Sequence, residues 1–309
     1  MHFHRLTPLV GSALSCLRLA ELVPQPFRQW FLDTYHETVA ANTVRLLTLD
    51  GILQKLSVAG ITPVLWKGVV LADSFYPDLG MRMMGDIDFA IAPEELSPFT
   101  QAIASLGFVE EPEKATTDAI YLRNGMGMLC DVHHRIHLFE GKEDSAIYCQ
   151  IHPRRLKAPS IKILSPDAMM VHLVVHMLGH RPETGPILQW ILDLAFVLQQ
   201  WGDRLDPTHI QALLPDHASW VTLLKTLRFL EAEWGVMIPA AFTPLLSAIQ
   251  PFTFGQVLRQ RRLALWGLPH LRGWVKLGVA QLMGDRYQQI PPPHLRDLLL
   301  WPIDLLQSP

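Results

Sequence analysis

The sequence of 309 residues predicts an α+β protein in which a core of alternating strands and helices lies between two helical parts. From residue 8 to residue 57, Leu, Val and Ile recur at helical spacings of three and four. After Gly60, short β-rich runs alternate with helical runs and turns. After Ser165, which begins a helix start signal, nearly every segment has helical spacing again. We therefore expect three parts, namely an N-terminal helical segment at 1–57, a core at 58–165 and a C-terminal helical domain at 166–309.

The elements of the core follow from local patterns. Strands are expected where β-rich or alternating runs occur, namely at "ITPVLW" (61–66), "DIDFAIA" (86–92), 119–123, 127–136 and within the connector 152–166. Helices are expected at "GVVLADSFY" (68–76), from Pro93 to about Leu106, and at 167–180, 186–201, 207–234 and 239–267. Pro and acidic residues begin the helix at Pro93, and Gly107 ends it.

Composition excludes several functions. Hydrophobic residues make up 49% of the chain, but Pro, Gly and charged residues interrupt every apolar run before the ~18 residues that a membrane span needs. We therefore expect no membrane span. The net charge of −3 gives no global basic field, so stable binding to nucleic acid is not expected.

Cysteine use and the N-terminus indicate the cytoplasm. Cys16, Cys130 and Cys149 are far apart and form neither a CxxC pair nor a disulfide framework, which is typical of reduced thiols. The first residues resemble a signal peptide in having a basic start and an apolar run, but Arg18 and Glu21 lie on its helical repeat. An amphipathic helix is the better interpretation.

Two acids inside a strand-like run are the first sign of chemistry. Asp86 and Asp88 share one face of the expected strand because side chains alternate with period two. Neighbouring carboxylates repel each other unless they bind a cation, share a proton or lie open to water. Asp131, in "MLCDVHHRI", would supply a third acid if its strand lies beside "DIDFAI". Mg²⁺ takes carboxylate oxygens together with substrate phosphates, so a metal site is one interpretation; solvated strand-end acids are the other.

Basic residues close by would suit a phosphate. Lys67 and Gly68 stand where a strand meets a helix, and the first turn of a helix offers free N–H groups to an anion. Gly68 would allow close approach of the backbone, Lys67 would add a mobile charge, and Arg82 could grip a phosphate with two N–H groups. Acids for a metal and cations for phosphates together favour phosphoryl or nucleotidyl transfer.

The stretch "LWKGVVLADSFYPDLGMRMMGDIDFAI" (65–91) resembles the signature of a largely uncharacterised bacterial nucleotidyltransferase family in the DNA polymerase β-like superfamily. "CDVHHRI" is similar to its D-x-H strand, and "HLVVHMLGHRPETGPILQWILDLAFVL" to its His-rich helix and W-x-x-D-[LI]-A helix. The resemblance covers roughly residues 10 to 200. The signature letters here are Lys67, Gly68, Ala72, Tyr76, Pro77, Arg82, Gly85, Asp86, Ile87 and Asp88.

The resemblance implies a small mixed sheet flanked by helices, which makes 58–165 the nucleotidyltransferase core. It implies a centre of two Mg²⁺ ions, with Mn²⁺ as an alternative, in which Asp86 and Asp88 are ligands. Asp131 would be the third carboxylate, which binds the ion nearest the acceptor hydroxyl and acts as the base for that hydroxyl. An NTP, with ATP among the candidates, would donate its NMP and release pyrophosphate. The wider superfamily usually has Gly-Ser where this chain has Lys67 and Gly68, so a lysine would take the place of the serine that helps to hold the triphosphate.

Further residues are candidate substrate contacts. His172, His176 and His180 recur every four residues along one helical stripe, but "HLVVH" lacks the glutamate of a zinc-protease HExxH motif. We expect His176, His180 and Arg181 to face the active-site cleft, with structural packing as the main alternative. His133 shares the strand face of Asp131 and is another candidate contact.

Two residues have a structural interpretation. His134 should point away from the face of Asp131 because side chains alternate along a strand. Asp193 is an acid on an apolar helix, where an unpaired charge is costly, so an ion pair with Arg181 or another cation is preferred to substrate contact.

The function predicted is Mg²⁺-dependent nucleotidyl transfer to a hydroxyl group. The acceptor is unidentified and could be a small molecule such as an antibiotic, a peptide, a sugar or a protein. Two alternatives remain: a non-catalytic module that binds a nucleotide or a partner, and another phosphoryl transferase. The released product separates the enzymes, because nucleotidyl transfer releases pyrophosphate whereas a kinase releases a nucleoside diphosphate.

Overall fold

A computed structural model describes residues 5–16, 21, 23–25, 27–139, 147–179, 187–247 and 249–250. The chain divides into two compact units. The sheet unit consists of Val39–Leu79 and Met83–His172, and the helical unit of Met1–Thr38, Gly80–Arg82 and Leu173–Pro309. The three-part division predicted above, at 1–57, 58–165 and 166–309, stays a prediction.

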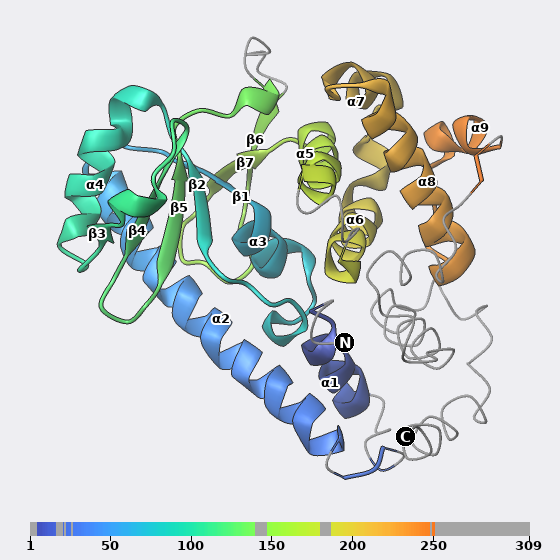
Figure 1. The fold of residues 1–309 in the computed structure, drawn as a ribbon, viewed down its shortest axis with the longest axis horizontal. Coiled ribbons are helices and arrows are strands. Elements are labelled where there is room, and N and C mark those ends of the chain that lie inside the picture. The colour runs from blue at the N-terminus through green and yellow to red at the C-terminus, as the bar shows by residue number, and fades with distance from the viewer. Residues whose placement is uncertain are drawn as a thin grey trace. The chain divides into compact units, whose positions relative to one another are not determined.

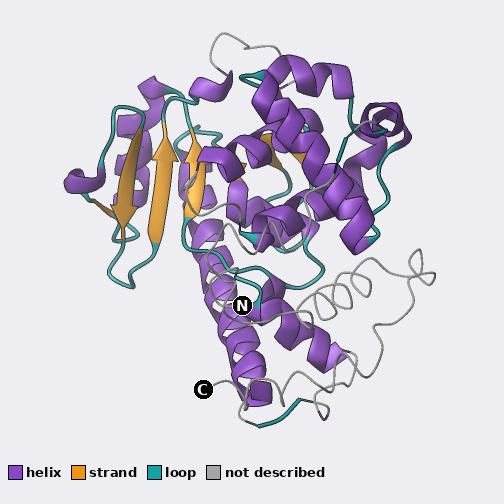
Figure 2. Ribbon diagram, turned by 45° about the vertical axis from the view of Figure 1, so that its right-hand side comes forward, coloured by secondary structure: helices purple, strands orange, loops and turns teal. Residues whose placement is uncertain are grey.

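A seven-stranded mixed sheet forms the centre of the sheet unit, in the order β3-β4-β5-β2-β1-β7-β6 (Figures 1 and 2). Strand β1 pairs in parallel with β7 and antiparallel with β2, and β2 pairs in parallel with β5. The strands are β1 (Val64–Trp66), β2 (Ile87–Ala90), β3 (Val109–Glu110), β4 (Ala119–Arg123), β5 (Leu129–His133), β6 (Tyr148–Ile151) and β7 (Ile161–Leu164). The predicted α+β class is thereby confirmed.

One face of the sheet is apolar and packs on helices. Leu65, Phe89, Val132 and Ile163 stand side by side across the central strands and are buried. Phe89 meets the ring of Phe99 on α4 (Leu96–Ala104) edge to face, with 5.3 Å between the ring centroids. Because side chains alternate, the residues one position along each strand point to the opposite face, where the acids lie.

The strand-to-helix connections follow their sequence signals. Strand β1 runs straight into α3 (Lys67–Val70), which continues as a π-helical turn at Leu71–Phe75. A 3₁₀ turn at Pro93–Glu95 precedes α4, and the Ala92 N–H donates to Glu95 Oε2 at 3.2 Å as an N-terminal cap.

A buried acid fastens the basic connector at 152–157. Asp73, in the π-helical turn, accepts hydrogen bonds from the backbone N–H groups of Arg154, Arg155 and Leu156. The guanidinium of Arg155 donates in turn to the carbonyl oxygens of Ala72, Asp73, Tyr76 and Pro77. The side chain of Arg155 therefore has a structural role.

The helical unit contains α1 (Thr7–Cys16), the beginning of α2 (Phe27–Val58), the end of α5 (Pro166–Gly179), α6 (Leu188–Trp201), α7 (Pro207–Leu213), α8 (His217–Trp234) and α9 (Thr243–Leu246). The single helical segment expected at 207–234 is wrong. Pro215 separates α7 from α8, and the Asp216 carboxylate caps α8 by accepting from the Ser219 N–H at 2.7 Å. In the part of the chain that the structure describes, no helix has the length and apolarity to cross a membrane.

Candidate active site on the polar face of the sheet

The polar face brings two acids and an imidazole together. Parallel pairing of β2 and β5 sets Asp88 beside Asp131, and His133 follows Asp131 on the same face. One ligand atom from each of the three residues lies within 4.8 Å of the others. His133 Nε2 is 3.0 Å from Asp131 Oδ2. We call Asp88, Asp131 and His133 the acid–histidine cluster.

The ammonium group of Lys67 lies within the acid–histidine cluster. Its Nζ is 2.6 Å from Asp88 Oδ1, 3.5 Å from Asp131 Oδ2 and 3.4 Å from His133 Nε2. Lys67 stands at the turn from β1 into α3 with a φ of +52°, a left-handed conformation that costs a non-glycine residue roughly 1 kcal/mol. A strained backbone thus directs a cation onto the acids.

Lys67 does not neutralise the site fully. Burial lowers its pKa, but the charges of Asp88 and Asp131 raise it by more, so the lysine stays protonated. Burial, with the charges of Asp86 and Asp131 acting in the same direction, raises the pKa of Asp88 to about 7 against the attraction of Lys67. Burial also acts to raise the pKa of Asp131, but hydrogen bonding to His133 and the charge of Lys67 lower it overall. The site is therefore short of positive charge.

The residues present fit a divalent cation. Asp131 Oδ1 is buried and has no hydrogen-bond partner among the described residues, so an oxygen ligand of the kind that Mg²⁺ prefers is free. Carboxylates and an imidazole also suit Mn²⁺. A divalent ion held by these residues would supply the missing charge.

The pKa of Asp88 predicts how the stability of the metal-free protein depends on pH. An unfolded aspartate has a pKa of about 3.9. Because the folded pKa is about 7, the folded chain keeps a proton between these values that the unfolded chain has lost. Stability therefore falls as the pH rises through this window. Relative to Asp88→Asn, we expect the wild type to lose roughly 3 kcal/mol of unfolding free energy from pH 5 to pH 8, as measured by urea unfolding with a chelator. A constant difference would contradict the raised pKa.

Asp86 lies at the edge of the site. It immediately precedes β2, on the strand face of Asp88, but is not part of the acid–histidine cluster. Arg45, on α2, is close enough that the charge of Asp86 opposes the burial that lowers the pKa of this guanidinium. No sequence pattern pointed to Arg45, because it stands on a helix far from the acids along the chain.

Arg82 is bound to another acid. Its Nε and Nη2 each donate to an oxygen of Asp193 at 2.8 Å, and both side chains are buried. Asp193 therefore has the cation partner that its burial demands, and this partner is Arg82. The predicted phosphate-binding role of Arg82 stays a prediction, and two of its donor groups are engaged in this pair.

The remaining candidates lie in different environments. Gly68 is buried in α3 next to Lys67. The ring of His176 packs edge to face on Trp190, with centroids 5.1 Å apart, which agrees with the packing alternative. His180 and Arg181 lie outside the described residues. Substrate contact by His133, His176, His180 and Arg181 stays a prediction.

Trp66 is a residue of the site that sequence reasoning missed. It pairs with Asp88 across β1 and β2 and packs edge to face on His133, with centroids 4.8 Å apart. Lys67 Nζ lies 5.0 Å from the centroid of the Trp66 ring. The indole Nε1 is buried without a hydrogen-bond partner among the described residues. Its place directly before Lys67 was the available signal.

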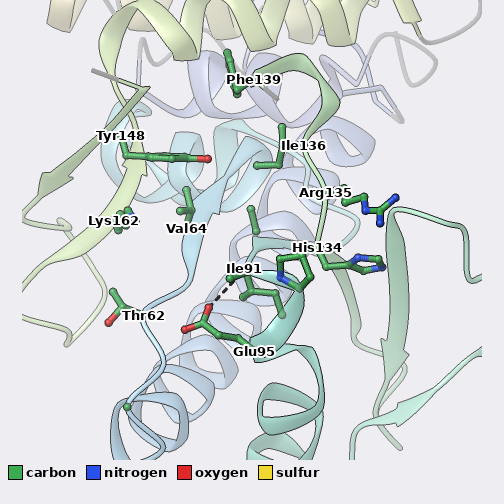
Figure 3. Close-up of a pocket in the computed structure, with 14 residues that line it drawn as sticks. Thr62, Val64, Ile91, Glu95, His134, Arg135, Ile136, Phe139, Tyr148 and Lys162 are labelled. Carbon is green, nitrogen blue, oxygen red and sulfur yellow. Dashed lines mark hydrogen bonds between the residues drawn. The ribbon is translucent and has the colours of Figure 1, made fainter. Parts of the chain in front are cut away.

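A pocket of about 680 Å³ opens on the same unit (Figure 3). Its walls come from the start of β1, the end of β2, the segment after β5, and strands β6 and β7. Val64 and Phe139 are buried side chains of its lining, and Tyr148 extends across it toward Ile136 (Figure 3). The volume is that of a small-molecule site.

Comparisons with known proteins bear on the family. A family model described as uncharacterised nucleotidyltransferase matches residues 1–232. A solution structure of the antibiotic-resistance factor ANT(2'')-Ia is similar, with 13% identity and a TM-score of 0.43 over 56% of this chain and 90% of that chain. The crystal structure of ANT(2'')-Ia with adenylyl-2''-tobramycin has 12% identity and a TM-score of 0.43 over 55% and 94%. An antigenic nucleotidyltransferase-like protein from Paracoccidioides brasiliensis has 13% identity and a TM-score of 0.41 over 63% and 94%. No curated protein matches.

The match to the family model spans most of the chain, including every described residue of the sheet unit and of the acid–histidine cluster. It confirms the family that the signature between Lys67 and Asp88 indicated. The chain therefore belongs to the family of uncharacterised nucleotidyltransferases.

Proposed function

We propose that the protein transfers an NMP from an NTP to a hydroxyl group of an acceptor in a reaction that depends on Mg²⁺. The observation that carries the proposal is the acid–histidine cluster, in which ligand atoms of Asp88, Asp131 and His133 converge and the site is short of positive charge. Membership of a nucleotidyltransferase family supports the same reaction class.

The reaction exchanges one bond to phosphorus for another. The acceptor oxygen bonds to the α-phosphorus of the NTP. The bond between the α-phosphorus and the oxygen that bridges the α- and β-phosphates breaks, and pyrophosphate leaves. The carboxylate of Asp131 receives the hydroxyl proton, through an oxygen that does not bind an ion. Asp86, Asp88 and Asp131 would hold two Mg²⁺ ions, or Mn²⁺ in their place, with His133 beside them. When bound, these ions supply neutralisation of the charge on the phosphate oxygens.

Lys67 changes partners in this proposal. In the structure its ammonium neutralises part of the charge on Asp88 and Asp131. A divalent ion held by the cluster would supply that neutralisation, and the ammonium of Lys67 would then be available to the phosphates of the NTP, close to the backbone of Gly68. Arg82 is a second candidate for a phosphate contact.

Product analysis tests the proposal. The full-length protein is incubated with Mg²⁺ and each NTP in turn, together with a sugar, a hydroxyl-bearing peptide and an aminoglycoside as candidate acceptors. Mass spectrometry should detect an acceptor that has gained an NMP, with equimolar pyrophosphate. A nucleoside diphosphate would identify another phosphoryl transferase, and metal-dependent NTP binding without any product would identify a binding module.

Lys67→Met should strengthen divalent binding in the absence of a nucleotide. The substitution removes the cation that competes for Asp88 Oδ1 and Asp131 Oδ2, so the Kd for Mn²⁺ should fall at least about tenfold, as measured by electron paramagnetic resonance. Lys157→Met is the matched control, because Lys157 is exposed and outside the cluster. Equal Mn²⁺ affinity in the wild type and Lys67→Met would exclude the exchange of partners.

A further inference from the structure

We infer that the pocket of about 680 Å³ holds the acceptor, and that this acceptor has a flat apolar body and a negatively charged group. The inference rests on the proposed function, because it names the substrate that meets the NTP at the acid–histidine cluster.

The pocket lies further along the strands that carry the acid–histidine cluster, and none of the three cluster residues lines it. Val64 and Ala90, which face each other across β1 and β2, contribute to its lining, and they stand two residues from Trp66 and Asp88. Residues two apart on a strand share a face and lie about 7 Å apart. His133 is the partner of Ala90 in β5, so it lies between Asp131 and the pocket.

The order of groups along the strands assigns the pocket to the acceptor. The turn of Lys67 and Gly68 follows the C-terminal end of β1, whereas the pocket lies toward the N-terminal end of this strand. Asp88 and Asp131 lie between the two. In an in-line displacement, the attacking and leaving oxygens are on opposite sides of the phosphorus. With the leaving phosphates at Lys67, the hydroxyl must approach from the pocket.

The lining indicates an apolar body. Val64 and Phe139 are buried side chains, and Tyr148 points its hydroxyl toward Ile136 across the pocket (Figure 3). An aromatic wall with apolar neighbours favours a flat group that packs on the tyrosine ring.

Lys162 supplies the charge. It is the β7 partner of Val64, it lines the pocket, and its Nζ lies 4.8 Å from the centroid of the Tyr148 ring. Its ammonium has no carboxylate partner among the described residues, and it therefore favours an anionic group. Glu95 also lines the pocket and accepts from the Ala92 N–H, and because Arg135 belongs to the lining too, the basic residues outnumber the acidic one. Arg135 is exposed and extends away from Tyr148 (Figure 3).

Three probes that share a phenol ring and differ in charge test the inference. They are 4-hydroxyphenylacetate, 4-hydroxyphenethyl alcohol and tyramine. Ligand-observed NMR titration of the full-length protein gives a Kd for each. We expect the carboxylate to bind about fivefold more tightly than the amine. Tyr148→Leu should weaken the binding of all three probes by roughly fivefold, because the aromatic wall is lost.

Variants of Lys162 locate the charge effect. Lys162→Met should abolish the preference for the carboxylate probe, Lys162→Arg should retain it, and Lys157→Met, on an exposed lysine outside the pocket, should leave it unchanged. The Kd for Mg²⁺ with a non-hydrolysable ATP analogue should stay within about twofold of the wild type in Lys162→Met, since the nucleotide lies toward Lys67.

The outcomes separate the inference from the proposed function. If Lys162→Met raised the Kd for the ATP analogue but kept the preference for the carboxylate probe, the pocket would hold the nucleotide and the inference would be wrong. Equal binding of the three probes would also overturn it. If the wild type showed the expected probe preference but formed no NMP adduct with any NTP, the proposed reaction would fail while the charge selectivity of the pocket stood.

Discussion

Asp88→Asn and Asp131→Asn should each lower kcat/KM for NMP transfer by at least about 10³-fold, which corresponds to roughly 4 kcal/mol of transition-state stabilisation. Each substitution removes a carboxylate of the acid–histidine cluster and hence charge that would hold a divalent ion. Steady-state release of pyrophosphate measures the loss. Mn²⁺ binding to the nucleotide-free variants should weaken in parallel, which ties the lost activity to the metal.

The fold should survive both substitutions. Asp88 is the stronger case, because its raised pKa shows that the ionised form is disfavoured in the folded protein, so a neutral amide is tolerated there. Glu110→Gln is the control, since Glu110 is an exposed acid on the edge strand β3 of the same sheet. Retained pyrophosphate release in Asp88→Asn, with Glu110→Gln also active, would mean that the chemistry occurs elsewhere on the chain.

The sequence predicted the central strands because burial leaves a clear pattern in them. The run around Asp88 alternates acids with residues that the structure buries against α4, such as Phe89. The hypothesis that the strand of Asp131 lies beside this run is confirmed by the pairing of Asp88 with Asp131. The acid in each of the two strands thus indicated that β2 and β5 are neighbours in the sheet.

The edge strands gave no such signal. Both residues of β3 are exposed, and β6 is partly exposed, so neither strand shows the alternation that marks a half-buried strand. They pair because the backbone N–H and C=O groups on the outer edges of β4 and β7 would otherwise lack partners. Such pairing depends on the backbone of a neighbour and cannot be found from the side chains of the segment itself.

The partners of the basic residues were the hardest to predict. Lys67 was expected to bind phosphate, but in the structure its ammonium lies 2.6 Å from Asp88 Oδ1. A sequence shows which residues carry charge but does not show which opposite charges the fold brings within reach. The turn geometry at Lys67, with its positive φ, decides this.

Arg82→Met should produce the largest loss of stability among the substitutions discussed. The buried pair of Arg82 and Asp193 is held by two hydrogen bonds of 2.8 Å, and removing the arginine leaves a carboxylate on α6 without this partner. Breaking a buried ion pair in this way costs about 3–5 kcal/mol, a large part of the stability of a typical domain. Urea unfolding monitored by circular dichroism measures the loss. Arg228→Met is the matched control, because the pair of Arg228 and Glu231 on α8 is partly exposed and should contribute at most about 1 kcal/mol.

The double variant Arg82→Met/Asp193→Leu shows whether the loss of stability in Arg82→Met arises from the buried charge of Asp193. Since apolar side chains can replace a buried ion pair with little loss, the double variant should be more stable than Arg82→Met alone.

The same variants decide between the two roles of Arg82, phosphate binding and pairing with Asp193. If its guanidinium binds phosphate, Arg82→Met should raise the Kd for the ATP analogue with Mg²⁺ more than Asp193→Leu does. Both variants are measured under conditions in which they are folded. If the guanidinium is instead committed to Asp193, the two substitutions would destabilise the fold alike, and the folded fraction of each would bind the nucleotide as the wild type does.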